Sequence, residues 1–150
     1  LYGINPTPNR DNPMQSVVEL TGRILQVRTV SQGETVGYGA AWKARRASRI
    51  AIAALGYADG IMRSGSGVDA RASGAAVVAG KRCPIVGAIS MDLTCIDVTE
   101  IADAPVQRGD IATFIGKDLS VDEVATSAGT IAYEILTRLG PRSHLVYRGG

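Results

Sequence analysis

The sequence predicts a mainly β domain, built as a barrel or a sandwich, with a short helical pair near its C-terminus. Three observations support this fold class. Apolar and polar residues alternate in the second half of residues 17–30, which is the period-two pattern of a half-buried strand. Further short apolar runs follow, separated by turns that contain glycine. Helix signals are confined to the last third of the chain.

The expected strands follow a proline-rich approach over residues 5–14, where X-Pro steps disfavour helix. After the strand within 17–30 we expect a fully buried strand over 49–56 and a hairpin around Gly80-Lys81-Arg82. The hairpin pairs residues 75–79 with residues 83–87. Strands at 93–99 and 111–115 and a final strand at 143–147 complete the set.

Two helices are expected from their end signals. Ser120 and Glu123 have the spacing of a capping box, which predicts a helix that begins after Ser120 and ends at Gly129. A second helix is expected from near Thr130 through Leu139, ended by Gly140-Pro141.

Composition excludes several classes of function. With 150 residues the chain forms one domain of ordinary size. A net charge of +2 and an aromatic fraction of 5% disfavour a nucleic-acid groove. Two cysteines, Cys83 and Cys95, cannot build a disulfide framework, so a cytoplasmic protein is expected, although a single bridge stays open. His144 is the one histidine of the sequence, which argues against a transition-metal site, and no apolar run approaches the ~20 residues of a membrane span.

The chain begins at Leu1 rather than at methionine. A processed or missing terminus is one explanation, and the removal of an upstream domain is the other. We expect the second, because of the motifs described next.

Three tyrosines have unusual surroundings. Tyr38 lies between two glycines, Tyr57 follows the expected buried strand, and Tyr133 begins the second expected helix. Taken singly, each tyrosine is better explained as an amphipathic residue whose hydroxyl finds a carbonyl partner. The segment 86–92 is likewise compatible with two strands that meet at a bend.

Together, four segments resemble the alanine racemase family in order and approximate spacing. They are Val-Gly-Tyr-Gly-Ala-Ala-Trp at 36–42, Gly-Tyr-Ala-Asp-Gly at 56–60, Val-Gly-Ala-Ile-Ser-Met-Asp at 86–92 and Ile-Ala-Tyr-Glu-Ile-Leu at 131–136. Residues 1–4 resemble the end of the last barrel segment of that family. The resemblance therefore implies that residues 1–14 are barrel end and linker, and that 15–150 are the C-terminal β domain.

The resemblance implies a pyridoxal-phosphate enzyme that works as a homodimer and converts L-alanine to D-alanine for the cell wall. Each active site takes the N-terminal barrel of one subunit and the β domain of the other. By motif, Tyr38 resembles the catalytic tyrosine, which serves one face of the substrate α-carbon. A free tyrosine has a pKa of ~10, so a tyrosine that acts as a base needs nearby positive charge.

The remaining site residues are also implied by motif. Met91 offers its backbone amide to the substrate carboxylate. Tyr57 reaches the mouth of the active site near Asp92 and Arg63. Tyr133 approaches the cofactor phosphate of its own subunit, whereas Tyr57 serves the site of the partner subunit. The lysine that binds the cofactor belongs to the absent barrel, so the isolated chain is expected to be inactive.

Two alternatives stay open. One is the β domain of a related pyridoxal-phosphate racemase or decarboxylase, although the segments at 37–39 and 90–92 fit decarboxylases poorly. The other is a free-standing β-barrel interaction module without catalysis. The sequence also leaves open whether the substrate is alanine or serine, and whether the enzyme serves cell-wall synthesis or amino-acid catabolism.

Overall fold

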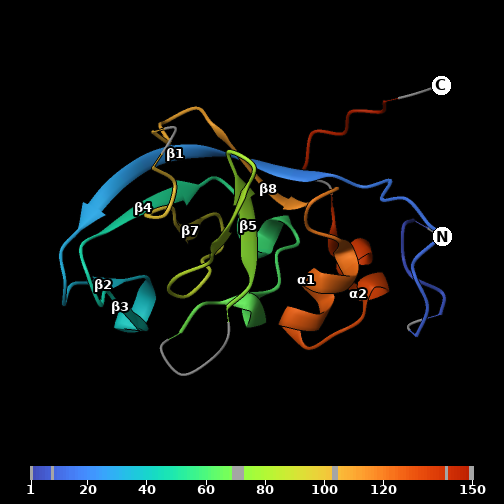
Figure 1. The fold of residues 1–150 in the computed structure, drawn as a ribbon, viewed down its shortest axis with the longest axis horizontal. Coiled ribbons are helices and arrows are strands. Elements are labelled where there is room, and N and C mark those ends of the chain that lie inside the picture. The colour runs from blue at the N-terminus through green and yellow to red at the C-terminus, as the bar shows by residue number, and fades with distance from the viewer. Residues whose placement is uncertain (1, 8, 69–72, 103–104, 141, 149–150) are drawn as a thin grey trace.

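A computed structural model describes residues 2–7, 9–68, 73–102, 105–140 and 142–148. Leu1, where the resemblance to the barrel end begins, and Pro141, which was expected to end the second helix, lie outside the described residues. The described chain folds around one antiparallel sheet of six strands in the order β6-β5-β8-β1-β4-β7 (Figure 1). The bounds are β1 Leu20–Val30, β4 Ser48–Ala53, β5 Ala75–Val78, β6 Lys81–Pro84, β7 Thr94–Asp97 and β8 Ile111–Ile115.

The sheet curls into a nearly closed barrel. Its two edge strands, β6 and β7, approach each other at a seam, where Ile85 and Ile96 form an isolated bridge. The Val86 amide donates to the Cys95 carbonyl over 2.9 Å at the same place. Closure removes most of the exposed edge that an open sheet would present. The predicted barrel is therefore confirmed.

Strand β1 is the long strand that joins the two halves of the barrel. Its first residues pair with β8 and its later residues with β4. Irregularities in register between Leu20 and Thr21 and between Ile24 and Gln26 bend it between these partners. The alternation read from residues 17–30 thus describes a real strand, which begins at Leu20.

Short elements outside the barrel position the loops. A two-stranded ribbon pairs β2 (Thr35–Val36) with β3 (Trp42–Lys43), and η1 (Tyr38–Ala40) is a single 3-10 turn between them. Two further 3-10 turns, η2 (Tyr57–Asp59) and η3 (Arg63–Gly65), follow β4. The sequence did not predict these turns.

Two helices cover one end of the barrel (Figure 1). Helix α1 (Val121–Ala128) has the predicted capping box of Ser120 and Glu123, and it ends at Gly129 in the left-handed conformation. Helix α2 (Ala132–Arg138) is shorter than predicted. Buried residues of both helices join the barrel core, which is centred on Phe114, Ile24 and Ile135.

Three details differ from the sequence predictions. The hairpin turn is Ala79-Gly80, both with positive φ, so Lys81 and Arg82 belong to strand β6. The strand predicted over 49–56 ends at Ala53. The final strand predicted at 143–147 is wrong: these residues are irregular, and Val146 and Tyr147 are 65% and 90% exposed. Their apolar pattern finds no sheet edge in the described part of the chain.

Two further observations concern composition. Both cysteines are free thiols, and burial raises the pKa of Cys83 and of Cys95. The disulfide that the sequence left open is not formed. Neither α-helix in the described ranges has the length or apolar character that a membrane-crossing helix requires.

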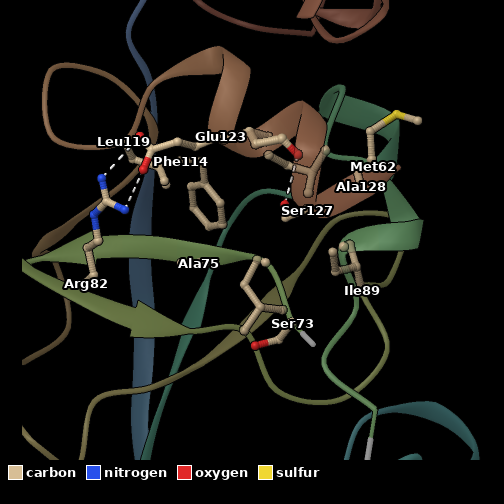
Figure 2. Close-up of a pocket in the computed structure, with 15 residues that line it drawn as sticks. Met62, Ser73, Ala75, Arg82, Ile89, Phe114, Leu119, Glu123, Ser127 and Ala128 are labelled. Carbon is tan, nitrogen blue, oxygen red and sulfur yellow. Dashed lines mark hydrogen bonds and ion pairs between the residues drawn. The ribbon is translucent and has the colours of Figure 1, made fainter. Parts of the chain in front are cut away.

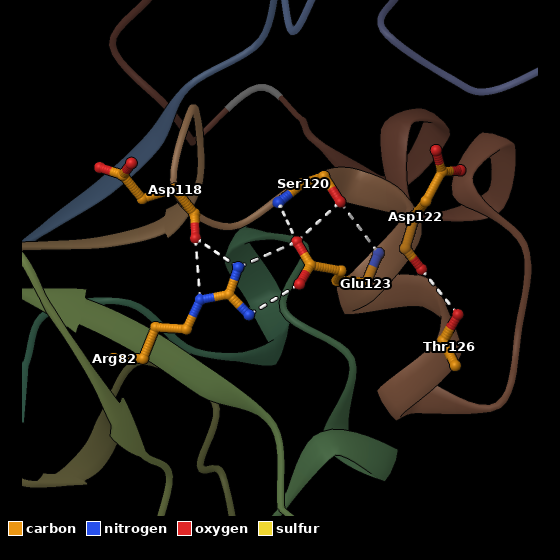
Figure 3. A network of polar contacts seen from close by, with 6 residues as sticks. All are labelled: Arg82, Asp118, Ser120, Asp122, Glu123 and Thr126. Atoms are coloured by element: carbon orange, nitrogen blue, oxygen red, sulfur yellow. Dashed lines mark hydrogen bonds and ion pairs between the residues drawn. The ribbon is translucent and has the colours of Figure 1, made fainter. Parts of the chain in front are cut away.

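A polar network fastens α1 to the β5–β6 hairpin (Figure 3). The Arg82 guanidinium binds both carboxylate oxygens of Glu123, at 2.7 and 3.1 Å, and donates to the Asp118 carbonyl. Glu123 also accepts hydrogen bonds from the Ser120 amide and hydroxyl. These contacts, with the Arg82 hydrogen bond first, lower the pKa of Glu123 from 4.5 to about 2.

We expect Glu123→Gln to lower the free energy of unfolding by about 1 kcal/mol near neutral pH, a figure discounted because the glutamate is partly exposed. The folded-state pKa lies below the ordinary value, so this contribution is present above pH 4.5 and is lost as the pH falls toward 2. Urea unfolding at several pH values should show the difference from the parent shrinking on acidification. Asp118→Asn is the matched control, because Asp118 binds Arg82 through its carbonyl; a loss independent of pH would contradict the prediction.

Candidate active site

An open pocket of about 380 Å³ brings four of the predicted site residues together. We call it the tyrosine pocket, and its walls are Tyr38, Tyr57, Arg63, Ile89, Ser90 and Met91. These residues come from three separate stretches of chain: η1, the η2–η3 region and the loop that joins β6 to β7. The two tyrosines and Met91 are exposed, Tyr38 by 75%.

Close backbone contact at glycines holds the Tyr38 turn in place. Gly37 has φ +81°, and a Cβ there would lie 2.8 Å from the Ala88 nitrogen. Gly87 has φ +73°, and its Cβ would lie 2.7 Å from the Val36 oxygen. Side chains at either position would push the two segments apart. The glycines beside Tyr38 and in segment 86–92 therefore fix where Tyr38 stands relative to the Met91 loop.

A second backbone contact fixes Tyr57 against Met91. The Tyr57 amide donates to the Ser90 carbonyl and the Ala58 amide to the Met91 carbonyl, both over 3.0 Å. Gly56 allows this approach, since a Cβ there would lie 2.4 Å from each carbonyl oxygen. No described residue accepts a hydrogen bond from the Met91 amide.

The third stretch contributes positive charge. Arg63 is exposed at the pocket and forms no ion pair with any carboxylate in the described ranges. Its turn is tied to the β6–β7 loop by the buried Ser66 hydroxyl, which donates to the Arg63 carbonyl and accepts from the Ile89 amide. The pocket therefore combines two phenols, a guanidinium and an amide, a donor set that suits a small carboxylate.

Two predicted residues lie outside the pocket walls. Asp92 adjoins Met91, but its carboxylate binds Arg142 at 2.7 Å. Arg142 also pairs with Asp59 at 3.3 Å, and nothing in the sequence apart from its charge pointed to this arginine. Tyr133 is exposed on the first turn of α2, and Figure 1 shows that helix at the far side of the molecule from the ribbon that carries Tyr38.

A separate, mostly apolar cavity of about 170 Å³ lies between the β5–β6 hairpin and α1 (Figure 2). Phe114 and Met62 line it, and the Arg82–Glu123 pair stands at one side. No buried side-chain nitrogen or oxygen of the described residues lacks a hydrogen-bond partner. It shares Ile89 with the tyrosine pocket but contains none of the predicted site residues. We interpret it as a packing cavity.

Comparison with known proteins identifies the domain. Residues 17–147 match the family model described as alanine racemase, C-terminal domain. An alanine racemase of Methylobacterium sp. (strain 4-46) is 55% identical over 98% of this chain and 39% of its own length. The crystal structure of the alanine racemase of Bartonella henselae, with covalently bound pyridoxal phosphate, superposes with a TM-score of 0.88 at 37% identity, over 98% of this chain and 39% of that one.

The fold thus defines the mainly β domain that solved alanine racemases share over this region. The chain belongs to the alanine racemase family and corresponds to its C-terminal domain. It spans about 39% of the length of these relatives. Relatives at 43% and 41% identity, from Agrobacterium fabrum and Mesorhizobium japonicum, are named biosynthetic and catabolic alanine racemase respectively.

Proposed function

We propose that this domain supplies the catalytic tyrosine and the substrate-contacting residues of a pyridoxal-phosphate-dependent alanine racemase. The other half of each site is an N-terminal barrel, contributed by the partner subunit of a homodimer. The observation that carries the proposal is the tyrosine pocket, which places Tyr38, Tyr57, Arg63 and the Met91 amide at one open surface. A surface of exposed reactive groups is what half of a composite site requires.

Tyr38 is the proposed acid–base group for one face of the substrate. Racemisation removes the α-proton from one side and returns a proton to the other, so it needs two groups on opposite faces. The Tyr38 phenol is exposed and stands on a turn that glycines hold rigidly against the β6–β7 loop. It therefore holds or receives the proton at its Oη, while the barrel supplies the group on the opposite face.

The substrate carboxylate is proposed to bind at Met91. The amide of Met91 has no hydrogen-bond partner among the described residues, and Arg63 adds positive charge at the same pocket. Both features favour an anionic group. Tyr57, with Asp92 beside the pocket, then forms the mouth through which alanine enters.

The chain's residues fit pyridoxal phosphate only in part. The exposed Tyr133 phenol can donate to a phosphate oxygen. None of the three lysines, Lys43, Lys81 and Lys117, lines the tyrosine pocket, so the covalent attachment belongs to the barrel. When bound, the cofactor supplies the electron sink that makes the α-proton removable. This domain binds it little, and its two free thiols fit a cytoplasmic enzyme that provides D-alanine for the cell wall.

An absorbance scan with pyridoxal phosphate, coupled to a D-alanine assay, tests the composite site. The purified chain should show no cofactor band and no turnover. Activity should appear when the barrel of an alanine racemase is supplied. A band with turnover in the chain alone would show that one of its own lysines binds the cofactor. Failure of every barrel to restore activity would favour a non-catalytic β module, and a parallel assay with serine would test the substrate.

A further inference from the structure

The chain that follows α2 returns to the tyrosine pocket. The end of α2 packs on the loop after Tyr57, because a Cβ at Gly60, which has φ +104°, would lie 2.8 Å from the Arg138 carbonyl oxygen. Arg142 lies a few residues farther on, and its side chain is 48% exposed. The C-terminal segment is thereby directed toward the loops that carry Tyr57 and Met91.

Arg142 binds one carboxylate from each of these loops. Its Nε lies 3.3 Å from Oδ1 of Asp59, and its Nη2 lies 2.7 Å from Oδ1 of Asp92. The other oxygen of Asp59 accepts from the Gly56 amide over 2.9 Å, so that carboxylate is fixed to its own turn. The Asp59 side chain is only 13% exposed. One guanidinium therefore bridges the η2 turn and the loop that carries Met91.

The bridge reinforces an existing contact. The same two loops already meet through the Tyr57–Ser90 and Ala58–Met91 backbone hydrogen bonds. Without the guanidinium, two carboxylates would remain close to this junction with no shared counter-charge. The hydrogen bond that Arg142 donates to Asp92, together with the negative charge of Asp59, raises the pKa of Arg142 further above the neutral range. An exposed ion pair contributes little to global stability, so the consequence of the bridge is local.

We propose that Arg142 is a positioning residue: by binding Asp59 and Asp92 together, it fixes the Met91 amide relative to Tyr57 and so sets the affinity for the substrate carboxylate. The inference rests on the proposed function of the tyrosine pocket. A group that binds the carboxylate does so before and during the reaction, and its displacement weakens substrate binding uniformly. The effect therefore belongs in KM rather than in kcat.

The test uses the full-length racemase that contains this domain. Arg142→Gln should raise KM for alanine about fivefold, the upper range for loss of an exposed ion pair, and leave kcat within about twofold. Hydrogen–deuterium exchange of the intact protein, without substrate, should accelerate about fivefold at the Tyr57 and Ala58 amides and remain unchanged in β1 and β8. Arg142→Lys keeps the charge but loses the planar fork, so its KM and exchange rates should lie between those of the parent and Arg142→Gln.

Arg138→Gln is the matched control. The Arg138 side chain is 53% exposed and pairs with Glu134 within α2. The substitution therefore removes a similar ion pair, but one that does not link two loops. Unchanged KM and unchanged exchange at residues 57–58 in Arg142→Gln would overturn the positioning role, as would equal effects in Arg138→Gln. The Tyr38→Phe variant distinguishes an error in the role of Arg142 from an error in the proposed function. A fully active Tyr38→Phe enzyme would overturn the proposed function itself.

Discussion

Tyr38→Phe in the full-length enzyme should lower racemisation by about 10²- to 10⁴-fold, the range for loss of a positioned acid–base group. The substitution removes only the hydroxyl, and the side chain is 75% exposed in this domain, so packing is hardly disturbed. Since enantiomers have equal free energy, kcat/KM must fall equally in both directions. The asymmetry should appear instead in exchange of the α-hydrogen with deuterated water, which should persist for one enantiomer and stop for the other.

Tyr147→Phe provides the control for this experiment. Tyr147 is 90% exposed and does not line the tyrosine pocket, so its hydroxyl should be dispensable. Chiral chromatography gives the racemisation rate, and proton NMR gives the exchange rate. Undiminished racemisation by Tyr38→Phe, or equal α-hydrogen exchange of both enantiomers, would contradict an acid–base role on one face.

Gly56→Ala should lower the free energy of unfolding by about 2–3 kcal/mol, the usual cost of forcing extra volume into a packed site. The new methyl group would lie 2.4 Å from the carbonyl oxygens of Ser90 and Met91, so the β6–β7 loop must move. The backbone of Gly56 is extended, with φ −143°, so the cost is steric and not a matter of backbone conformation. Displacement of the Met91 amide should also reduce kcat/KM by about 10²-fold.

Gly65→Ala is the matched control for Gly56→Ala. A Cβ at Gly65 would meet only the Ile89 Cδ1 atom, at 4.0 Å, which is ordinary van der Waals contact. Urea unfolding monitored by circular dichroism, together with steady-state kinetics, should separate the two alanine variants. Equal free energies of unfolding for the two variants would contradict the prediction, because the β6–β7 loop would then move at no cost in stability.

Individual helices and strands could be predicted from the sequence because capping residues and apolar patterns act over a few neighbouring residues. Ser120, Glu123 and Gly129 define both ends of α1, and the pattern of residues 17–30 indicated β1, although buried and exposed residues alternate only from Leu20 to Ile24. The strand expected at 143–147 was wrong because a strand also needs a free sheet edge, which no local pattern reveals. Sheet order was beyond reach for the same reason: β1 pairs with β4 and β8, which are far from one another in sequence.

Part of the candidate site was likewise predictable from local motifs, and part depended on contacts between distant residues. Motifs selected Tyr38, Tyr57, Arg63 and Met91, and the structure brings these four together. Their roles remain predictions. Arg142 was missed because its importance comes from two carboxylates that lie 83 and 50 residues away along the chain, which are Asp59 and Asp92. No local sequence pattern around Arg142 indicates that it binds these two carboxylates.

The seam of the barrel lies beside the loop that carries Met91. That loop begins where β6 ends and stops where β7 begins, and these edge strands are joined near the loop by the Ile85–Ile96 bridge. The barrel is therefore closed least completely at this seam, beside the loop that carries Met91. Displacement of the loop must break its hydrogen bonds to the Tyr57 and Ala58 amides and strain the bridged seam, while the ladders from β1 to β4 and to β8 need not change. Strain from a displaced Met91 loop should therefore appear at the seam between β6 and β7 and not in the ladders behind it.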